Sequence, residues 1–144
     1  GFGGNNIKLI NKRTNEKQLI NYIKKHGHII CQKFLPGIKK GDKRVFIING
    51  KIVGAISRVP QKGSFLSNMS KGGVAKIAYL SRNELRISKI VGKNLKKNNI
   101  FLAGIDFISE KLNGDINVTS PTGLKTHFEL SGNNLAKKFW NELK

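Results

Sequence analysis

The chain has 144 residues, which is enough for one domain with a packed core. Its formal net charge is +19, from 27 Lys and Arg residues against 8 Asp and Glu residues. Such a charge attracts anions, but Lys is also the general surface residue of this sequence, so charge alone selects no partner. The single cysteine, Cys31, excludes an intrachain disulfide and lies in an apolar run that predicts a buried thiol. No apolar run is long enough to span a membrane.

The first third of the chain predicts a strand, a helix and a second strand. The chain opens on Gly1 rather than on Met, and we therefore expect it to be a piece of a larger protein. A glycine-rich turn precedes the first strand. The predicted elements are a strand at 7–10, a helix from Asn15 to about His26 that Gly27 ends, and a strand at 28–34 that residues 35–37 interrupt.

The middle of the chain predicts a hairpin and then a long loop. Residues 45–48 and 52–57 are apolar runs joined by Asn49-Gly50, which is a strong short-range hairpin signal. Residues 59–76 hold several Gly and Ser residues and little apolar periodicity. A loop of this length in a compact domain is usually functional or disordered.

The last part of the chain predicts two helices around a second hairpin. Ser81 and Glu84 form a capping box for a helix that continues to about Lys97. Strands are expected at 100–108 and 116–118 around an Asn113-Gly114 turn. Ser131 is expected to cap a last helix, whose packing residues would be Leu135, Phe139, Trp140 and Leu143. The fold class is therefore α+β with mainly antiparallel hairpins.

Three polar side chains are expected to gather on the second hairpin. Asp115 and Asn117 are two positions apart on one strand and so share a face. The hairpin would bring Asp106 close to them. Two carboxylates and an amide oxygen are ligands that suit Mg²⁺. The alternative is that they are ordinary solvent-facing residues of an exposed sheet.

Two arginines and two glycine pairs are candidates for binding phosphate. Arg44 begins one strand of the first hairpin and Arg58 ends the other, and Arg forms bidentate contacts with carboxylate and phosphate. Gly3-Gly4 and Gly72-Gly73 can present backbone N–H groups to a phosphate. For the arginines, the alternative is a solvated strand end. Neither glycine pair forms a P-loop or a dinucleotide-binding signature.

Taken in order, these motifs resemble the C-terminal half of prokaryotic glutathione synthetase, a member of the ATP-grasp superfamily. The resemblance covers essentially the whole chain. Its most specific stretches are Gly-Asp-Lys-Arg-Val at 41–45 and Ile-Asn-Val-Thr-Ser-Pro-Thr at 116–122. It implies a partial ATP-grasp domain over residues 1–144, with an antiparallel sheet, flanking helices and a long mobile lid loop at 59–76.

The resemblance also implies a reaction. ATP would phosphorylate the C-terminal carboxylate of γ-glutamylcysteine, and the amine of glycine would attack the acyl phosphate to give glutathione. The implied cofactors are ATP and Mg²⁺, with Mn²⁺ as an alternative metal. The resemblance implies a cytoplasmic enzyme that is a homo-oligomer at full length and has no nucleic-acid or membrane partner.

The residues that match the family pattern fall into four groups. Asp106, Asp115 and Asn117 match the metal ligands, and Asp115 stands where the family usually has Glu. The catalytic group is Arg44, Arg58 and Gly73. The substrate group, which would form a wall of the glycine site, is Ser120 and Thr122. The nucleotide group is Gly3, Gly4, Gln32, Lys33, Phe34, Leu35, Asp42, Asn68 and Gly72.

Two positions of the expected lid depart from the family pattern. The family commonly has arginine where this chain has Leu66 and Val74. Because lysine lacks the bidentate geometry of arginine, nearby lysines would not replace them fully. The departures suggest weaker substrate retention, a different substrate, or a non-catalytic paralogue. We also expect the 144-residue chain to have little or no synthetase activity by itself, because part of the nucleotide site would lie upstream.

Two further functions compete with a glutathione synthetase. One is another ATP-grasp carboxylate–amine ligase, which would share the metal ligands but lack the Ser-Pro-Thr turn. The other is a basic nucleic-acid-binding module, which only the charge supports. The sequence has no helix-turn-helix, zinc-finger or aromatic RNA-binding signature.

Overall fold

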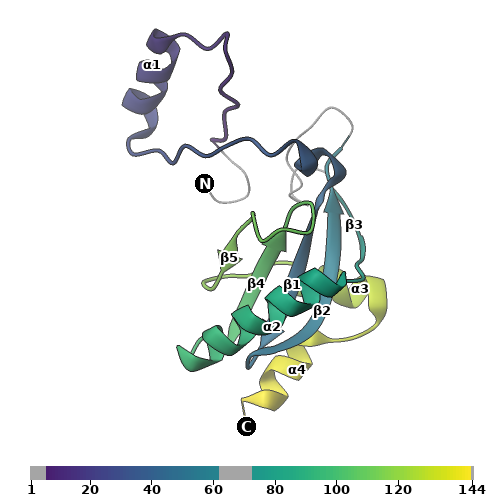
Figure 1. Cartoon of the computed structure of the whole chain (residues 1–144). Coiled ribbons are helices and arrows are strands. Elements are labelled where there is room, and N and C mark those ends of the chain that lie inside the picture. The colour runs from purple at the N-terminus through teal and green to yellow at the C-terminus, as the bar shows by residue number, and fades with distance from the viewer. Residues whose placement is uncertain (1–5, 62–72, 144) are drawn as a thin grey trace. The chain divides into compact units, whose positions relative to one another are not determined.

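The structure is a computed structural model that describes residues 6–61 and 73–143. The chain divides into two compact units, Gly1–Pro36 and Gly37–Lys144, and each is described by itself. Figure 1 shows the elements of both units along the chain. No helix in the described part of the chain is long and apolar enough to cross a membrane.

The first unit is built around helix α1, Glu16–His26, as the sequence predicts. The Asn15 side chain caps its first turn, and Gly27, with φ 73°, ends it. The strands predicted at 7–10 and 28–34 are wrong, because no strand forms in either range. A strand needs a hydrogen-bonded neighbour, and the described residues of this unit supply none.

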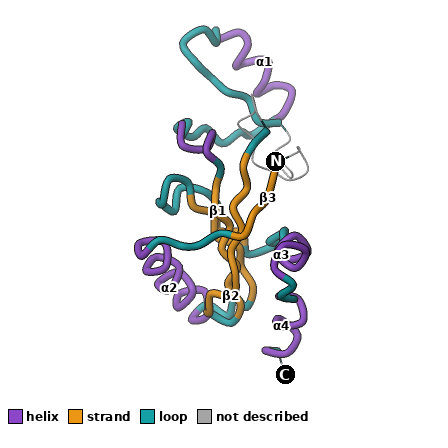
Figure 2. Tube along the Cα trace, turned by 90° about the vertical axis from the view of Figure 1, so that its right-hand side faces the viewer, coloured by secondary structure: helices purple, strands orange, loops and turns teal. Residues whose placement is uncertain are grey.

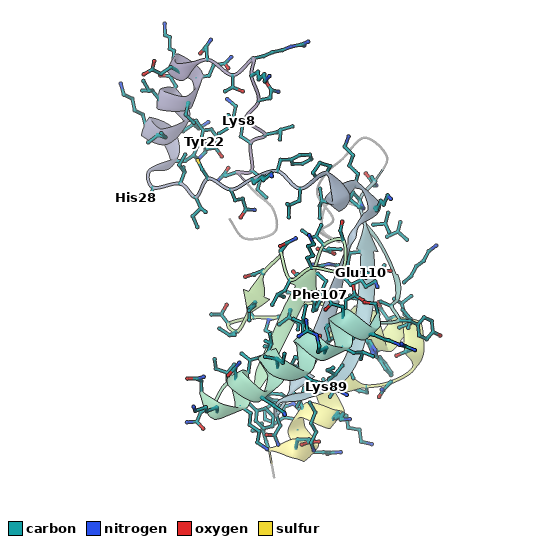
Figure 3. All side chains as sticks on the ribbon, viewed as in Figure 1. Lys8, Tyr22, His28, Lys89, Phe107 and Glu110 are labelled. Carbon is teal, nitrogen blue, oxygen red and sulfur yellow. The ribbon has the colours of Figure 1, made fainter. Side chains whose placement is uncertain are left out.

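Side chains of the first unit hold the segment before α1 against the helix. The Lys8 ammonium lies 5.7 Å from the centre of the Tyr22 ring, and the Tyr22 hydroxyl donates to the Asn6 carbonyl (Figure 3). Cys31 is exposed, so the predicted buried thiol is wrong. It lies in the segment after α1, in which no strand forms.

The second unit contains a five-stranded sheet in the order β3-β2-β1-β4-β5, and all its pairings are antiparallel. Asn49 and Gly50 join the first hairpin with φ values of 49° and 75°, the positive values that a tight hairpin turn of this type requires. A short 3₁₀ helix, η2, precedes the sheet. The bounds are η2 Pro36–Lys40, β1 Asp42–Ile48, β2 Lys51–Val59, β3 Val74–Ile77, β4 Leu102–Phe107 and β5 Ile116–Asn117.

The loop between β2 and β3 is shorter than the predicted range 59–76, because strands occupy both ends of that range. Strand β2 continues to Val59, and β3 begins at Val74, which pairs with Val59. Residues 62–72, with Leu66, Asn68 and Gly72 among them, lie outside the described residues. Gly3 and Gly4 also lie outside them.

Three helices accompany the sheet. Helix α2, Arg82–Lys97, begins with the predicted Ser81–Glu84 capping box. Helix α3, Leu124–Ser131, is missing from the sequence prediction because it is short and follows Gly123 without a side-chain cap. Ser131 is thus the last residue of α3 rather than a cap, and the Asn134 side chain caps helix α4, Leu135–Glu142.

The helices cover opposite faces of the sheet (Figure 2), as the alternation of side chains along each strand requires. On the α2 face the core contains Val45, Ile47 and Phe107. On the α3–α4 face it contains Phe46, Ile56 and Leu135. Trp140, predicted as a packing residue, is 65% exposed, although its ring meets Phe139 edge-on. The fold is α+β, as predicted.

Candidate functional site

One end of the α3–α4 face of the sheet is polar although it is buried. On β1, Asp42 and Arg44 share this face with Phe46, because alternate residues of a strand point the same way. On β2 the same alternation places Arg58 beside Ile56. The sheet order sets β1 between β2 and β4, which brings Asp106 of β4 opposite Arg44. We call Asp42, Arg44, Arg58 and Asp106 the arginine–aspartate network.

The arginine–aspartate network is continuous from β2 to β4. Arg58 donates to Asp42 through Nε and Nη2, at 2.8 and 2.6 Å. Its Nη2 also reaches Oδ2 of Asp106 at 2.9 Å. Arg44 donates to both oxygens of Asp106, through Nε at 2.8 Å and Nη2 at 2.7 Å. Asp106 therefore accepts hydrogen bonds from both arginines, two from Arg44 and one from Arg58.

Burial makes this network costly to disrupt. Each of the four residues is between 5% and 8% exposed, and their formal charges sum to zero. Burial lowers the pKa of Arg58, but the hydrogen bond to Asp42 and the charges of Asp106 and Asp42 outweigh it and raise that pKa above its usual value. Arg58 therefore remains a cation throughout the physiological pH range.

Arg44 connects the network to the Ser-Pro-Thr turn. Its Nη1 donates to the carbonyl oxygen of Thr122 at 3.2 Å and to the Thr122 hydroxyl at 3.1 Å. Gly104 leaves the space for this contact, because a Cβ there would come within 3.4 Å of Arg44 and 3.1 Å of Pro121. Thr122 and Ser120 are both exposed and are available to a ligand.

The second hairpin brings two of the three predicted metal ligands to one face. Asn117 pairs with Gly104, so its side chain projects to the same side of the sheet as Asp106, which is two positions further along β4. Asp115 precedes β5, and its carbonyl accepts from the Asp106 N–H at 2.9 Å. Asp115 is exposed.

The donor chemistry of these three residues fits a hard divalent cation, but some of their oxygens already have partners. Asp106 accepts three hydrogen bonds from the two arginines. The Asn117 side-chain oxygen accepts from the N–H groups of Thr119 and Ser120. Among the described residues, no group of three or more His, Cys, Asp or Glu side chains forms a metal site. Asp115 is the most exposed of the three predicted ligands.

Other predicted site residues belong to the first unit or precede β3. Gln32, Lys33, Phe34 and Leu35 belong to the first unit, where they form an extended, mostly exposed segment. Gly73 is buried immediately before β3. The sequence did not predict that Asp42 pairs with Arg58, although the Asp-x-Arg pattern at the start of β1 and an arginine near the end of its partner strand were the available signal.

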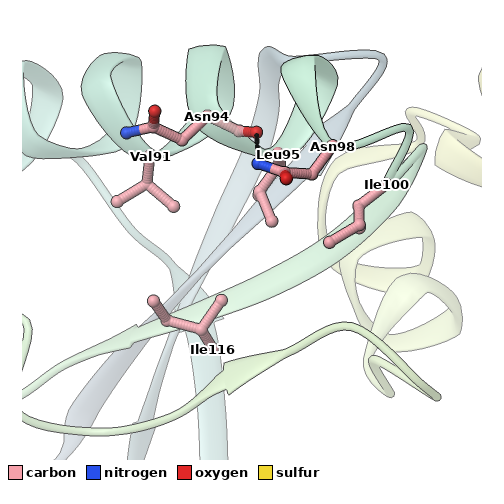
Figure 4. Close-up of a pocket in the computed structure, with 6 residues that line it drawn as sticks. All are labelled: Val91, Asn94, Leu95, Asn98, Ile100 and Ile116. Atoms are coloured by element: carbon pink, nitrogen blue, oxygen red, sulfur yellow. Dashed lines mark hydrogen bonds between the residues drawn. The ribbon is translucent and has the colours of Figure 1, made fainter.

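A hollow of about 210 Å³ lies on the α2 face of the sheet, away from the arginine–aspartate network. Figure 4 shows its lining, in which the Asn98 amide donates to the Asn94 carbonyl at 2.8 Å. Its other lining residues are Val91, Leu95, Ile100 and Ile116. Because these four residues are all aliphatic, the hollow lacks the charged groups that phosphate chemistry needs.

Comparison with known proteins identifies the family. Residues 1–131 match a family model described as "Prokaryotic glutathione synthetase, ATP-grasp domain". Glutathione synthetase of Prochlorococcus marinus subsp. pastoris is 38% identical over 146 aligned positions, covering 99% of this chain and 47% of the relative. The corresponding protein of Rhodopseudomonas palustris is 40% identical over 112 positions, covering 78% of this chain and 36% of the relative. This chain thus spans at most about half the length of these relatives, and it belongs to the prokaryotic glutathione synthetase ATP-grasp family.

Proposed function

We propose that the protein containing this chain joins γ-glutamylcysteine and glycine in an ATP-dependent reaction that proceeds through an acyl phosphate. The observation that carries the proposal is the family match over residues 1–131, which includes the whole arginine–aspartate network and the Ser-Pro-Thr turn. The relatives that share this region are named glutathione synthetase. The proposal includes ATP and Mg²⁺ as cofactors, a cytoplasmic location, and a homo-oligomer as the full-length protein.

The buried cations support the phosphoryl-transfer part of this proposal. Phosphoryl transfer depends mainly on positioning and on stabilising charge on the phosphate oxygens. The Arg58 guanidinium is held at a defined place by Asp42 and stays charged. A cation that is already oriented needs little reorganisation when negative charge develops beside it, so Arg58 is suited to stabilise a transferring phosphoryl group.

The second hairpin supports the metal part of the proposal. Asp106, Asp115 and Asn117 would hold Mg²⁺, with Asp115 as the most accessible ligand. When bound, Mg²⁺ neutralises charge on the phosphate oxygens of the nucleotide. Asp106 would bind through the oxygen that accepts only one arginine hydrogen bond, Oδ1, because Oδ2 already accepts two.

The exposed Ser-Pro-Thr turn supports the acceptor part of the proposal. The Thr122 hydroxyl contacts the network through Arg44, and Ser120 and Thr122 would bind the small amino acid that attacks the acyl phosphate. For the nucleotide, we propose contacts from Gln32 to Leu35, Asp42, Gly3, Gly4, Asn68 and Gly72, with Gly73 completing the catalytic group. A lid in the segment between β2 and β3 would exclude water, which otherwise hydrolyses an acyl phosphate.

The test is product formation by the protein as it is encoded. We expect ADP release that requires both γ-glutamylcysteine and glycine, with glutathione identified by mass spectrometry. Asp115→Asn should weaken activation by Mg²⁺, while Glu129→Gln, at an exposed position of α3, serves as the matched control. ATP turnover with other peptides but not with γ-glutamylcysteine would instead favour another ATP-grasp carboxylate–amine ligase.

The isolated 144-residue chain gives a second test. Because it spans 47% of its Prochlorococcus relative, we propose that it forms little or no glutathione without the rest of the domain. Normal glutathione formation by this chain alone would contradict that proposal while supporting the assignment of the reaction.

A further inference from the structure

The sequence contains two Asn-Gly dipeptides, Asn49-Gly50 and Asn113-Gly114. In such a dipeptide the backbone nitrogen of glycine attacks the asparagine side chain with particular ease, because glycine has no Cβ to hinder the approach. The reaction is deamidation. An aliphatic residue precedes each asparagine, so the local sequence gives the two dipeptides similar reactivity. The fold gives them different surroundings.

The Asn49-Gly50 turn is half-buried and is held through both its side chain and its backbone. The Asn49 side-chain amide donates to Oε2 of Glu142 at 3.2 Å, and the Asn49 N–H donates to the Phe101 carbonyl at 2.8 Å. The Gly50 backbone packs against helix α2, since a Cβ at Gly92 would lie only 2.4 Å from the Gly50 carbonyl oxygen. Ring closure expels the nitrogen that contacts Glu142, so this hydrogen bond opposes the reaction.

The Asn113-Gly114 turn has fewer restraints. Both residues are exposed, and the Asn113 side chain makes no hydrogen bond to any other described residue. The Gly114 N–H donates to the Asp106 carbonyl at 3.1 Å, and this bond has to open before the nitrogen can react. It joins two neutral groups at the end of a hairpin whose second strand, β5, has only two residues. We therefore expect it to open more easily than the bond to the Glu142 carboxylate.

Deamidation at this turn consumes water and releases ammonia. The Gly114 nitrogen loses its proton to solvent and bonds to Cγ of Asn113, and Nδ2 takes up a proton and leaves as ammonia, which closes a succinimide ring. Water then opens the ring at one of its two carbonyls. Opening at Cγ leaves aspartate. Opening at the former main-chain carbonyl breaks its bond to the Gly114 nitrogen and leaves isoaspartate, in which the main chain runs through Cγ.

Isoaspartate at position 113 would disturb the hairpin beside the predicted metal ligands. It inserts a carbon into the main chain before Gly114 and adds a carboxylate. Gly114 lies tightly against Asp106, because a Cβ on Gly114 would come within 2.6 Å of the Asp106 Cβ. A lengthened main chain cannot keep both hydrogen bonds of Asp106 in register, the one from Gly114 and the one to the Asp115 carbonyl.

We propose that Asn113-Gly114 is a site of spontaneous deamidation in the folded protein, and that Glu142 protects Asn49-Gly50 from the same reaction. Isoaspartate at position 113 loosens the hairpin that carries Asp106 and Asp115. The proposal concerns the covalent state of this hairpin and does not depend on the reaction assigned to the protein.

Peptide mass spectrometry of the encoded protein after incubation at mildly alkaline pH measures both sites in one sample. In the folded protein Asn113 should deamidate about fivefold faster than Asn49 or more, because a hydrogen bond to a charged acceptor costs more to break than one between neutral groups. In concentrated denaturant the two rates should become similar, since only the fold distinguishes the dipeptides. Fragmentation that separates isoaspartate from aspartate identifies the product at position 113.

Two variants test the two parts of the proposal. Glu142→Ala removes the acceptor of the Asn49 side chain and should raise the Asn49 rate about threefold or more, with the Asn113 rate unchanged. Trp140 fluorescence reports whether α4 stays folded in this variant. Asn113→Gln, which would have to close a larger ring, is the unreactive reference for the hairpin. Relative to it, protein with isoaspartate at position 113 should show about tenfold faster hydrogen exchange at the Asp106 amide.

Three results would overturn the proposal. They are equal rates at the two dipeptides in the folded wild type, an unchanged Asn49 rate in Glu142→Ala with α4 folded, and undiminished protection of the Asp106 amide in the isoaspartate form. The first result comes from the wild type alone, so the proposal stays testable even where Glu142→Ala fails to fold.

Discussion

Replacement of Asp106 by Asn tests whether the arginine–aspartate network stabilises the fold. Asp106→Asn keeps the shape of the side chain but removes the negative charge between two buried arginines. We expect a loss of unfolding free energy, because Arg44 has no other carboxylate among its hydrogen-bond partners in the described structure.

The expected loss of unfolding free energy follows from the burial of Asp106 and from the Arg58–Asp42 ion pair that remains in the variant. Removing one partner of a buried ion pair typically costs about 3–5 kcal/mol. Arg58 keeps its contact with Asp42 at 2.6 Å, so most of the loss falls on Arg44. We therefore expect Asp106→Asn to cost about 3 kcal/mol, at the lower end of that range.

Urea unfolding measures this change. The single tryptophan, Trp140, lies in α4 and reports on the second unit by fluorescence, with circular dichroism as the independent signal. Asp115→Asn is the matched control, because it makes the same chemical change at an exposed position on the neighbouring segment. We expect the control to change stability by about 0.5 kcal/mol or less.

A small effect would refute the reasoning. If Asp106→Asn costs less than about 1 kcal/mol, or no more than the control, the network contributes little to folding. If the variant is more stable than the wild type, Asp106 is instead kept for its ligand role at the expense of stability.

Three further predictions concern residues outside the network. Gly54→Ala should cost about 1–3 kcal/mol in urea unfolding, because the added methyl group would overlap the ring of His127. Ser88→Ala should be neutral or stabilising by about 1 kcal/mol, because the buried hydroxyl has no partner. The hydrogen bond from Asn49 lowers the pKa of Glu142, so its stabilisation is present above the ordinary pKa and is lost as pH falls below about 4.5. Glu142→Gln should therefore flatten the dependence of stability on pH in that acidic range. A harmless Gly54→Ala, a costly Ser88→Ala, or an unchanged acid limb in Glu142→Gln would each contradict the corresponding contact.

Local signals in the sequence were sufficient for several elements. The Asn49-Gly50 turn and the Ser81–Glu84 capping box were predicted correctly, because each depends on residues within a few positions of one another. The strands predicted at 7–10 and 28–34 were wrong for the opposite reason. An apolar run becomes a strand only when another strand lies beside it, and the run itself does not show whether one does.

In the candidate site, too, contacts between near neighbours could be predicted from the sequence, whereas contacts between distant strands could not. Alternation along the strands was enough to predict that Asn117 shares a face with Asp106, whereas Asp115 lies outside β5. The capture of Asp106 by Arg44 and Arg58 was not predictable in this way. It depends on β1 lying between β2 and β4, an order that brings together residues from three strands.

The sequence by itself determined the family, the α+β class and the residue types available for phosphate and metal chemistry. It also determined which neighbours along a strand face the same way, because that follows from backbone geometry. Only the tertiary structure decided that Arg44 donates to Thr122 and that Arg58 donates to both Asp42 and Asp106. The physical reason is that a hydrogen bond requires a donor and an acceptor about 3 Å apart, and only the folded sheet brings such distant residues to that separation.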